Sequence, residues 1–132
     1  MSPNVELVQN LYAAFGRGDI DALVAGCAPN VRWRVNGRPS DFPMIGTWTG
    51  PEGVREFFGQ LAETEEADAF EPREFYASED MVFVLGRYAW TMRKNGRKAD
   101  AEWVHVFRIE DGKVASFTDF TDTAQFAEAW RS

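Results

Sequence analysis

The N-terminal stretch of the chain carries apolar residues at the spacing of an amphipathic helix. Ser2 and Pro3 are typical of a helix start, because a serine side chain can cap the first amides and proline fits the first turn. Gly16 favours the end of this helix, and Asp19 can cap a second, short one. The apolar positions are Val5, Val8, Leu11, Tyr12 and Phe15 in the first helix, and Ile20, Leu23 and Val24 in the second. The pattern therefore predicts a helical hairpin.

The middle of the chain is expected to hold a short strand, a long loop and a third helix. Residues 31–35 read as a strand, whereas residues 36–50 contain repeated Gly and Pro without a sustained period, which predicts a loop bordering an opening. Gly50 and Pro51 predict the start of the third helix. Its apolar face holds Val54, Phe57, Phe58 and Leu61. The acidic residues 63–68 are expected to end this helix as solvated surface.

The remaining chain changes to strand character. Segments rich in aromatic and β-branched residues span 75–77, 81–92, 99–109 and 114–121. Asn95-Gly96 and Asp111-Gly112 are typical of tight hairpin turns with positive φ angles, so the last three segments are expected to form an antiparallel meander. Thr121 or Asp122 can cap a last helical turn. Its apolar residues are Ala124, Phe126, Ala127 and Trp130.

This order of elements predicts an α+β fold, in which N-terminal helices pack on a strongly curved antiparallel sheet and form a cone around a pocket. The chain has 132 residues, of which 45% are hydrophobic, so residues 1–132 are expected to form a single domain with one core. Its five Trp and eleven Phe exceed what packing alone needs in a core of this size. Some of these rings are therefore expected to face a cavity.

Charge and cysteine content narrow the expected partners and compartment. A net charge of −7 and a pI near 4.7 give a surface that repels phosphates and anionic lipid, so neither nucleic acid nor a membrane is an expected partner. Cys27 is the only cysteine and is expected to be a small buried hydrophobe. The N-terminus lacks the basic and apolar regions of a signal peptide, and no apolar run approaches the ~20 residues that cross a bilayer. These features predict a reduced, cytoplasmic protein.

Three segments in order resemble one protein family. They are LYAAFGRGDIDAL at 11–23, GTWTGPEGVREFF at the start of the third helix, and EWVHVFRIEDGKVASFTDF at 102–120. The chain resembles the nuclear transport factor 2-like superfamily and, within it, the SnoaL-like polyketide cyclases and ketosteroid isomerase-like proteins. The resemblance implies a cystatin-like cone with a largely apolar cavity, often in a homodimer. Because the family includes isomerases, dehydratases, aldol cyclases, epoxide hydrolases and binding-only domains, the fold does not settle the function.

His105 is the only histidine, and strand alternation places it on one apolar face with Trp103 and Phe107. A hairpin closed at residues 111–112 puts His105 opposite about residue 118, within one residue of Asp119. By position, the two residues match the histidine and aspartate of SnoaL-like cyclases, so the resemblance implies that Asp119 is the acid/base. The alternatives are a structural His–Asp pair, or an Asp119 that caps the C-terminal helix.

Two activities of the superfamily lose support at specific positions. Where ketosteroid isomerases have a tyrosine on the first helix, this chain aligns Leu11, and Tyr12 is expected to be turned about 100° away. The base and the second acid of those isomerases fall at Val35 and His105. Steroid isomerisation by that mechanism is therefore not expected.

The epoxide hydrolases of the superfamily use an Asp-Arg-Asp relay. Arg87 and Asp119 could supply two of its parts, but the residue two after Arg87 is Ala89, so the relay is incomplete. Arg87 could still face the pocket as an anion anchor, or pair with a carboxylate such as Glu102.

Large rings are expected to line the pocket, and their number favours a flat apolar or aromatic ligand, although each ring could instead belong to the core. The predicted ligand-binding residues are Trp33, Trp48, Arg87, Tyr88, Trp90, Trp103 and Phe107. Phe42 and Met44 in the 36–50 loop are placed to close the mouth.

Neither a metal site nor a cofactor is expected, because a single His without nearby His or Cys at ligand spacing cannot build a zinc or iron site, and no Gly-rich phosphate loop follows a strand. The leading hypothesis is a cofactor-independent lyase, isomerase or cyclase acting on a small apolar carbonyl compound, with Asp119 as acid/base and His105 as its partner. The alternatives are a non-catalytic domain that binds an apolar ligand, and a homodimeric module that associates through an outer sheet face including Val104 and Val106.

Overall fold

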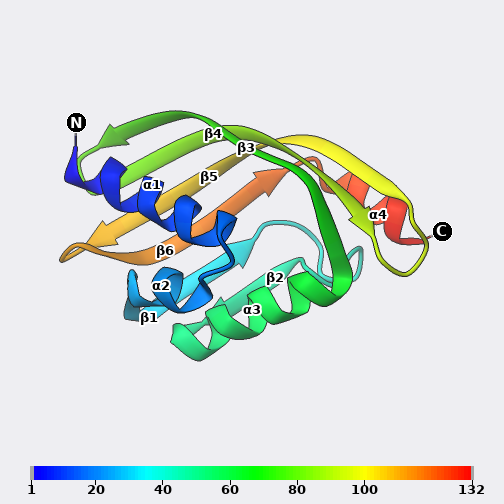
Figure 1. Cartoon of the computed structure of the whole chain (residues 1–132), viewed down its shortest axis with the longest axis horizontal. Coiled ribbons are helices and arrows are strands. Elements are labelled where there is room, and N and C mark those ends of the chain that lie inside the picture. The colour runs from blue at the N-terminus through cyan, green and yellow to red at the C-terminus, as the bar shows by residue number, and fades with distance from the viewer. Residues whose placement is uncertain (1, 132) are drawn as a thin grey trace.

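The computed structural model describes residues 2–131 and has the predicted α+β organisation (Figure 1). Along the chain its elements are α1 (Pro3–Gly16), α2 (Ile20–Ala25), β1 (Cys27–Val35), β2 (Gly46–Thr49), α3 (Gly50–Thr64), β3 (Glu65–Ser78), β4 (Met81–Met92), β5 (Lys98–Glu110), β6 (Lys113–Thr121) and α4 (Thr123–Arg131).

The helix starts follow the predicted capping residues. The Ser2 hydroxyl accepts hydrogen bonds from the first amides of α1, and a carboxylate oxygen of Asp19 accepts one from the amide of Ala22 in α2. The buried side of α1 holds Val5, Val8, Leu11 and Ala14. Both helices of the predicted hairpin are therefore confirmed.

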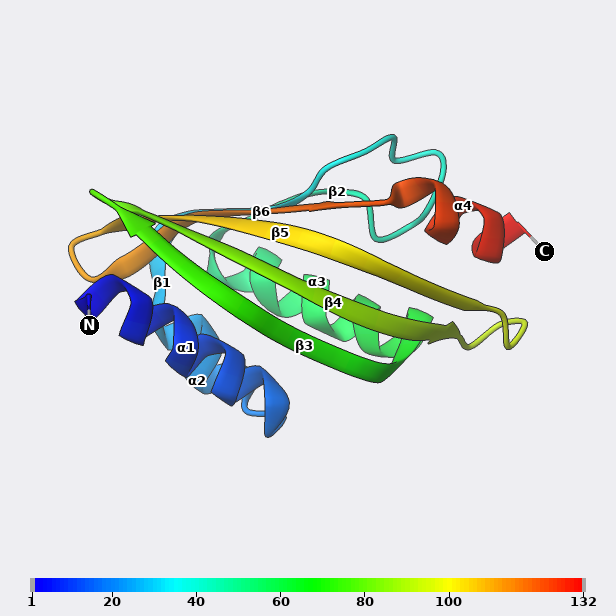
Figure 2. The same ribbon diagram turned by 90° about the horizontal axis from the view of Figure 1, so that it is seen from above.

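The strands form one curved, unclosed sheet in the order β2-β1-β6-β5-β4-β3. Every neighbouring pair is antiparallel except β1 and β6, which run parallel. Figure 2 shows α1, α2 and α3 along one side of the sheet, with α4 at the far end beside the connection from β1 to β2. Phe42 from that connection packs on Phe126 and Trp130 of α4, at ring-centroid distances of 5.5 and 5.7 Å. The prediction of helices packed on a curved sheet is confirmed.

Three segments differ from the predictions. Residues 46–49, predicted as loop, form β2, because they pair with residues 32–35 of β1. The helix α3 ends at Thr64, and Glu63, Glu66 and Asp68 are exposed as predicted, but β3 starts at Glu65, which is buried, and pairs with the whole length of β4. The connection from β4 to β5 spans residues 93–97, and of the predicted Asn95-Gly96 pair only Gly96 has a positive φ, of 73°. By contrast, Asp111 and Gly112 both have positive φ and form the predicted tight turn.

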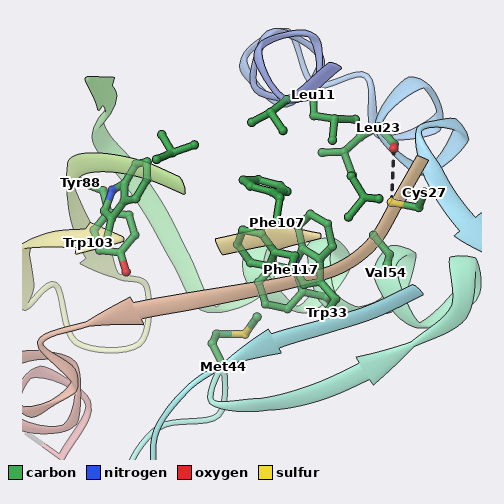
Figure 3. Close-up of a cluster of buried hydrophobic side chains, with 14 of the residues drawn as sticks. Leu11, Leu23, Cys27, Trp33, Met44, Val54, Tyr88, Trp103, Phe107 and Phe117 are labelled. Carbon is green, nitrogen blue, oxygen red and sulfur yellow. Dashed lines mark hydrogen bonds between the residues drawn. The ribbon is translucent and has the colours of Figure 1, made fainter. Parts of the chain in front are cut away.

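The core between the sheet and the helices combines aromatic rings with aliphatic side chains (Figure 3). Trp33 of β1 stacks on Phe117 of β6 at a centroid distance of 4.1 Å, and Phe107 of β5 lies 5.1 Å from the same Phe117 ring. Cys27 is buried as predicted, and its thiol donates to the carbonyl of Leu23 at 3.6 Å. Burial raises the pKa of this thiol to about 11. Among residues 2–131, no helix is both long and apolar enough to span a membrane.

Candidate functional site: a polar chain in an apolar cavity

A cavity lies between the helices and the inner face of the sheet. Its empty volume is about 820 Å³, counting the solvent at its mouth. Apolar side chains from all four helices, from every strand except β2 and from the β1–β2 connection form most of its wall. The polar side chains in the wall are Tyr12, Glu65, Tyr88, His105, Asp119, Thr121 and Thr123. A ligand here would therefore be held mainly by apolar contact and oriented by a few polar groups.

His105 and Asp119 lie directly opposite each other on β5 and β6. The His105 Nε2 atom lies 3.5 Å from Asp119 Oδ1, and both side chains are almost wholly buried. This separation is within ion-pair range, but the Nε2 atom has no aligned hydrogen bond to any described residue. Asp119 therefore faces the cavity, and it is not a cap of α4.

A β-bulge brings this pair into register. Ile109 pairs with Val114, as hairpin counting from the turn predicts, but the next residue, Arg108, pairs with Ser116. Ala115 is thus the extra residue on β6, and it moves the partner of His105 from residue 118 to Asp119.

Two tyrosines extend the pair into a chain of polar contacts. The Tyr88 hydroxyl donates to Asp119, with distances of 3.1 Å to Oδ2 and 3.4 Å to Oδ1. The Tyr12 hydroxyl lies 2.7 Å from Nδ1 of His105. Burial, and secondarily the charge of Asp119, raises the pKa of both phenols well above the ordinary value, so each keeps its proton. We therefore assign Tyr12 as donor to Nδ1, which leaves the imidazole proton on Nε2, toward Asp119.

The position of Tyr12 corrects the sequence prediction. Tyr12 was expected to turn away from the pocket, but both Tyr12 and its neighbour Leu11 line the cavity. The inward face of α1 is broad enough to include both residues, since Tyr12 also follows Val8 by four residues and precedes Phe15 by three. The helical spacing of these residues thus indicated an inward Tyr12. The alignment of Leu11 with the tyrosine of ketosteroid isomerases hid this indication.

The ring of His105 is stacked on Trp103. Their centroids are 3.7 Å apart and their planes differ by 16°. Gly86 on β4, the register partner of Trp103, makes this possible, because a Cβ at that position would lie 2.3 Å from the indole and 2.6 Å from the backbone oxygen of Glu71. Trp103 is predicted to bind ligand, but it lies outside the cavity wall and instead supports the imidazole.

Glu65 is a polar group of the wall that the sequence did not reveal. It is 4% exposed, and its Oε1 atom has no hydrogen-bond partner among the described residues. Burial, followed by the charge of Asp119, raises the pKa of its carboxyl group to about 8. No sequence signal separates this glutamate from the exposed Glu66 that follows it.

Of the other predicted ligand-binding residues, some line the cavity and some lie outside it. Trp33, Tyr88, Trp90 and Phe107 line the cavity, as do Phe42 and Met44 of the β1–β2 connection. Trp48 does not, because it lies on the short edge strand β2 and packs against Phe57 at 4.9 Å.

Arg87 is also outside the cavity, which contradicts its prediction as an anion anchor. Its guanidinium group pairs with Asp100 at 2.7 Å and with Glu71 at 3.1 Å on the outer face of the sheet, not with Glu102. The reason is strand alternation, since adjacent residues point to opposite faces and Tyr88 points inward. Within residues 2–131, no three His, Cys, Asp or Glu side chains form a group that could hold a metal ion.

The chain is similar to the members of one protein family and to several solved structures. The model of the SnoaL-like domain family matches residues 8–117. No curated protein matches the chain. Two similar solved structures are nuclear transport factor 2-like proteins from Burkholderia. The one from Burkholderia pseudomallei is 34% identical and superposes with a TM-score of 0.91, and the one from Burkholderia thailandensis is 30% identical with a TM-score of 0.89. In both comparisons the match covers 100% of each chain.

A third similar structure is that of TerC, co-crystallised with polyporic acid. It is 30% identical, has a TM-score of 0.85, and the match covers 99% of this chain and 100% of TerC. The family model covers most of the chain, and full-length structural matches at 30% identity or more agree with it. The chain therefore belongs to the SnoaL-like domain family of the nuclear transport factor 2-like superfamily.

Proposed function

We propose that this protein binds a small apolar or aromatic carbonyl compound in its cavity and catalyses proton transfer on it, as a cofactor-independent isomerase, lyase or cyclase. The observation that carries the proposal is the contact chain Tyr12–His105–Asp119–Tyr88 in a mostly apolar wall. Buried polar groups that touch a cavity can act on a ligand without competition from bulk water.

The proposed step is enolisation. The Asp119 carboxylate accepts a proton from the carbon next to the ligand's carbonyl group, and the C–H electron pair moves into the enolate, so that negative charge develops on oxygen. The Nε2–H of His105, which lacks an aligned partner, is available to stabilise that oxygen. Return of the proton to the same or another carbon gives isomerisation. Attack by the enolate carbon on a second carbonyl forms a C–C bond and an alkoxide, which takes the proton back from Asp119 to complete cyclisation.

The similarity to TerC supports a small-molecule ligand for this protein. TerC was co-crystallised with polyporic acid, and it matches this chain over almost its full length. Calorimetric titration of the wild-type protein with polyporic acid is therefore a rational first test of binding.

Exchange of carbon-bound hydrogen tests the proposed chemistry. In D₂O, the wild-type protein should accelerate loss of the C1 proton signals of 2-tetralone, measured by NMR. Because general base catalysis contributes about 10²–10⁴-fold, we expect Asp119→Asn to lower the rate by at least about 100-fold. Asp111→Asn is the matched control, since Asp111 is an exposed turn residue whose left-handed backbone suits asparagine. A wild-type rate equal to that of buffer would remove the proton-transfer proposal, and full activity of Asp119→Asn would remove Asp119 as base.

A non-catalytic binding domain is the second candidate function. The Tyr88 hydroxyl donates toward both carboxylate oxygens of Asp119, which is also how a purely structural carboxylate is satisfied. Binding of polyporic acid by the wild-type protein without exchange of 2-tetralone or other aromatic ketones would favour this candidate.

A further inference from the structure

Glu65 is a buried acid that the proposed proton transfer does not use. It is the first residue of β3, directly after α3, and pairs with Met92. Met92 is eight residues along β4 from Val84, the partner of His105. Glu65 therefore reaches the cavity wall from a different part of the sheet than the His105–Asp119 pair.

The surroundings of Glu65 disfavour a negative charge. Lys and Arg are absent from the cavity wall formed by the described residues. The other titratable groups in that wall are Tyr12 from α1, Tyr88 from β4, His105 from β5 and Asp119 from β6. The two tyrosines keep their protons, and the charge of Asp119 opposes a second carboxylate. A carboxyl group in such a site gains most from being neutral, in which state one oxygen carries a donor hydrogen.

The Oε1 atom of Glu65 also lacks a protein partner. Among the described residues no group forms a hydrogen bond with it, although the side chain is almost fully buried. A buried polar atom without a partner is costly, and a ligand that supplies the missing partner recovers that cost.

We propose that Glu65 is a neutral carboxylic acid that donates a hydrogen bond to an oxygen acceptor of the ligand, at a second polar point of the cavity. The inference rests on the proposed function, because it requires a ligand in this cavity. It narrows the ligand class to aromatic compounds with a carbonyl or similar acceptor oxygen placed apart from the carbon that exchanges its proton. Ligand cations are not expected, since a neutral acid does not attract them.

A pair of probes of nearly equal shape tests the hydrogen bond. 2-Acetylnaphthalene carries a carbonyl acceptor, and 2-isopropylnaphthalene replaces it by a saturated carbon. At pH 6, where Glu65 is neutral, calorimetry should show that the wild-type protein binds the ketone about tenfold more tightly than the hydrocarbon, as one added hydrogen bond implies. This preference should decline above about pH 8 as Glu65 ionises.

Three variants make the test specific. Glu65→Leu should lose the preference for the ketone, whereas Glu65→Gln should keep part of it at every pH, because its amide group donates without ionising. Glu66→Gln is the control, since Glu66 is the exposed neighbour that pairs with Arg93 outside the cavity, and it should leave the preference unchanged. In parallel, the infrared difference between wild type and Glu65→Gln at pH 6 should contain the C=O stretch of a protonated carboxyl group.

The outcomes separate this inference from the proposed function. If both probes bind and Glu65→Leu retains the ketone preference, or if the infrared difference shows a carboxylate at pH 6, the inference is overturned while the ligand cavity stands. If neither probe nor polyporic acid binds to the wild-type protein, the proposed function fails and the ligand contact of Glu65 fails with it.

Discussion

Replacing Glu65 with glutamine should change how the stability of this protein depends on pH. The pKa of Glu65 is raised from 4.5 to about 8, first by burial. Between these values the folded protein keeps a proton that the unfolded chain releases, so rising pH favours the unfolded chain. Stability from the neutral carboxyl group is fully present below about pH 4.5 and is lost as pH rises toward 8. The loss is about 1.4 kcal/mol for each pH unit in this window.

Glutamine cannot ionise and contributes no such slope. The free energy of unfolding of Glu65→Gln minus that of wild type should therefore rise by roughly 2–3 kcal/mol between about pH 5.5 and 7.5. Taking this difference cancels the pH dependence of all other groups that the two proteins share.

Urea unfolding followed by tryptophan fluorescence measures this difference directly. Unfolding curves are needed at three pH values inside the window for wild type, Glu65→Gln and the control Glu66→Gln, whose side chain is exposed and paired with Arg93. A difference between wild type and Glu65→Gln that stays constant across the window would show that Glu65 ionises in the folded protein as it does in the unfolded chain. That result would refute the reasoning from burial.

Three further predictions concern the imidazole, its support and the outer face. Tyr12→Phe leaves Nδ1 of buried His105 without its partner, so it should lower the free energy of unfolding by about 1–3 kcal/mol in urea and slow 2-tetralone exchange; unchanged stability would contradict the assigned hydrogen bond. Gly86→Ala forces a Cβ against Trp103 and the Glu71 backbone and should cost about 1–3 kcal/mol, whereas Gly59→Ala, on an open helix surface, should cost nothing. Equal melting temperatures for these two variants would argue against the close approach. We also propose a homodimer through the outer sheet face, so light scattering should give a dimer mass for wild type and a monomer mass for Val106→Lys; a wild-type monomer would refute it.

Much of the fold could be predicted because its signals are local. Helix caps such as Asp19, and the glycine-containing turn at residues 111–112, depend on a few adjacent residues. The bounds of β4 agree with the sequence prediction, which rested on the many aromatic and β-branched residues between 81 and 92. The strand β2 was not predictable in the same way, since its four residues become a strand only by pairing with β1.

The candidate site was predictable only in part. Alternation and hairpin counting brought His105 close to Asp119, but the residues around Ala115 carry no local signal for the bulge that sets the final register. Burial of Glu65 likewise depends on where β3 begins relative to the cavity, which composition does not report. The sequence prediction placed both Arg87 and Tyr88 in the pocket. Adjacent residues of a strand point to opposite faces, so an inward Tyr88 requires Arg87 to lie on the outer face.

The bulge at Ala115 also affects how family members should be compared. Without that residue, His105 would face Thr118, and Asp119 would point to the opposite side of the sheet. A one-residue deletion between the turn and Phe117 could thus abolish the site while the histidine and the aspartate both stayed in the sequence. Relatives that keep both the histidine and the aspartate should therefore be sorted by the number of residues that separate them. In a relative whose spacing differs by one residue, the histidine and the aspartate should no longer face each other.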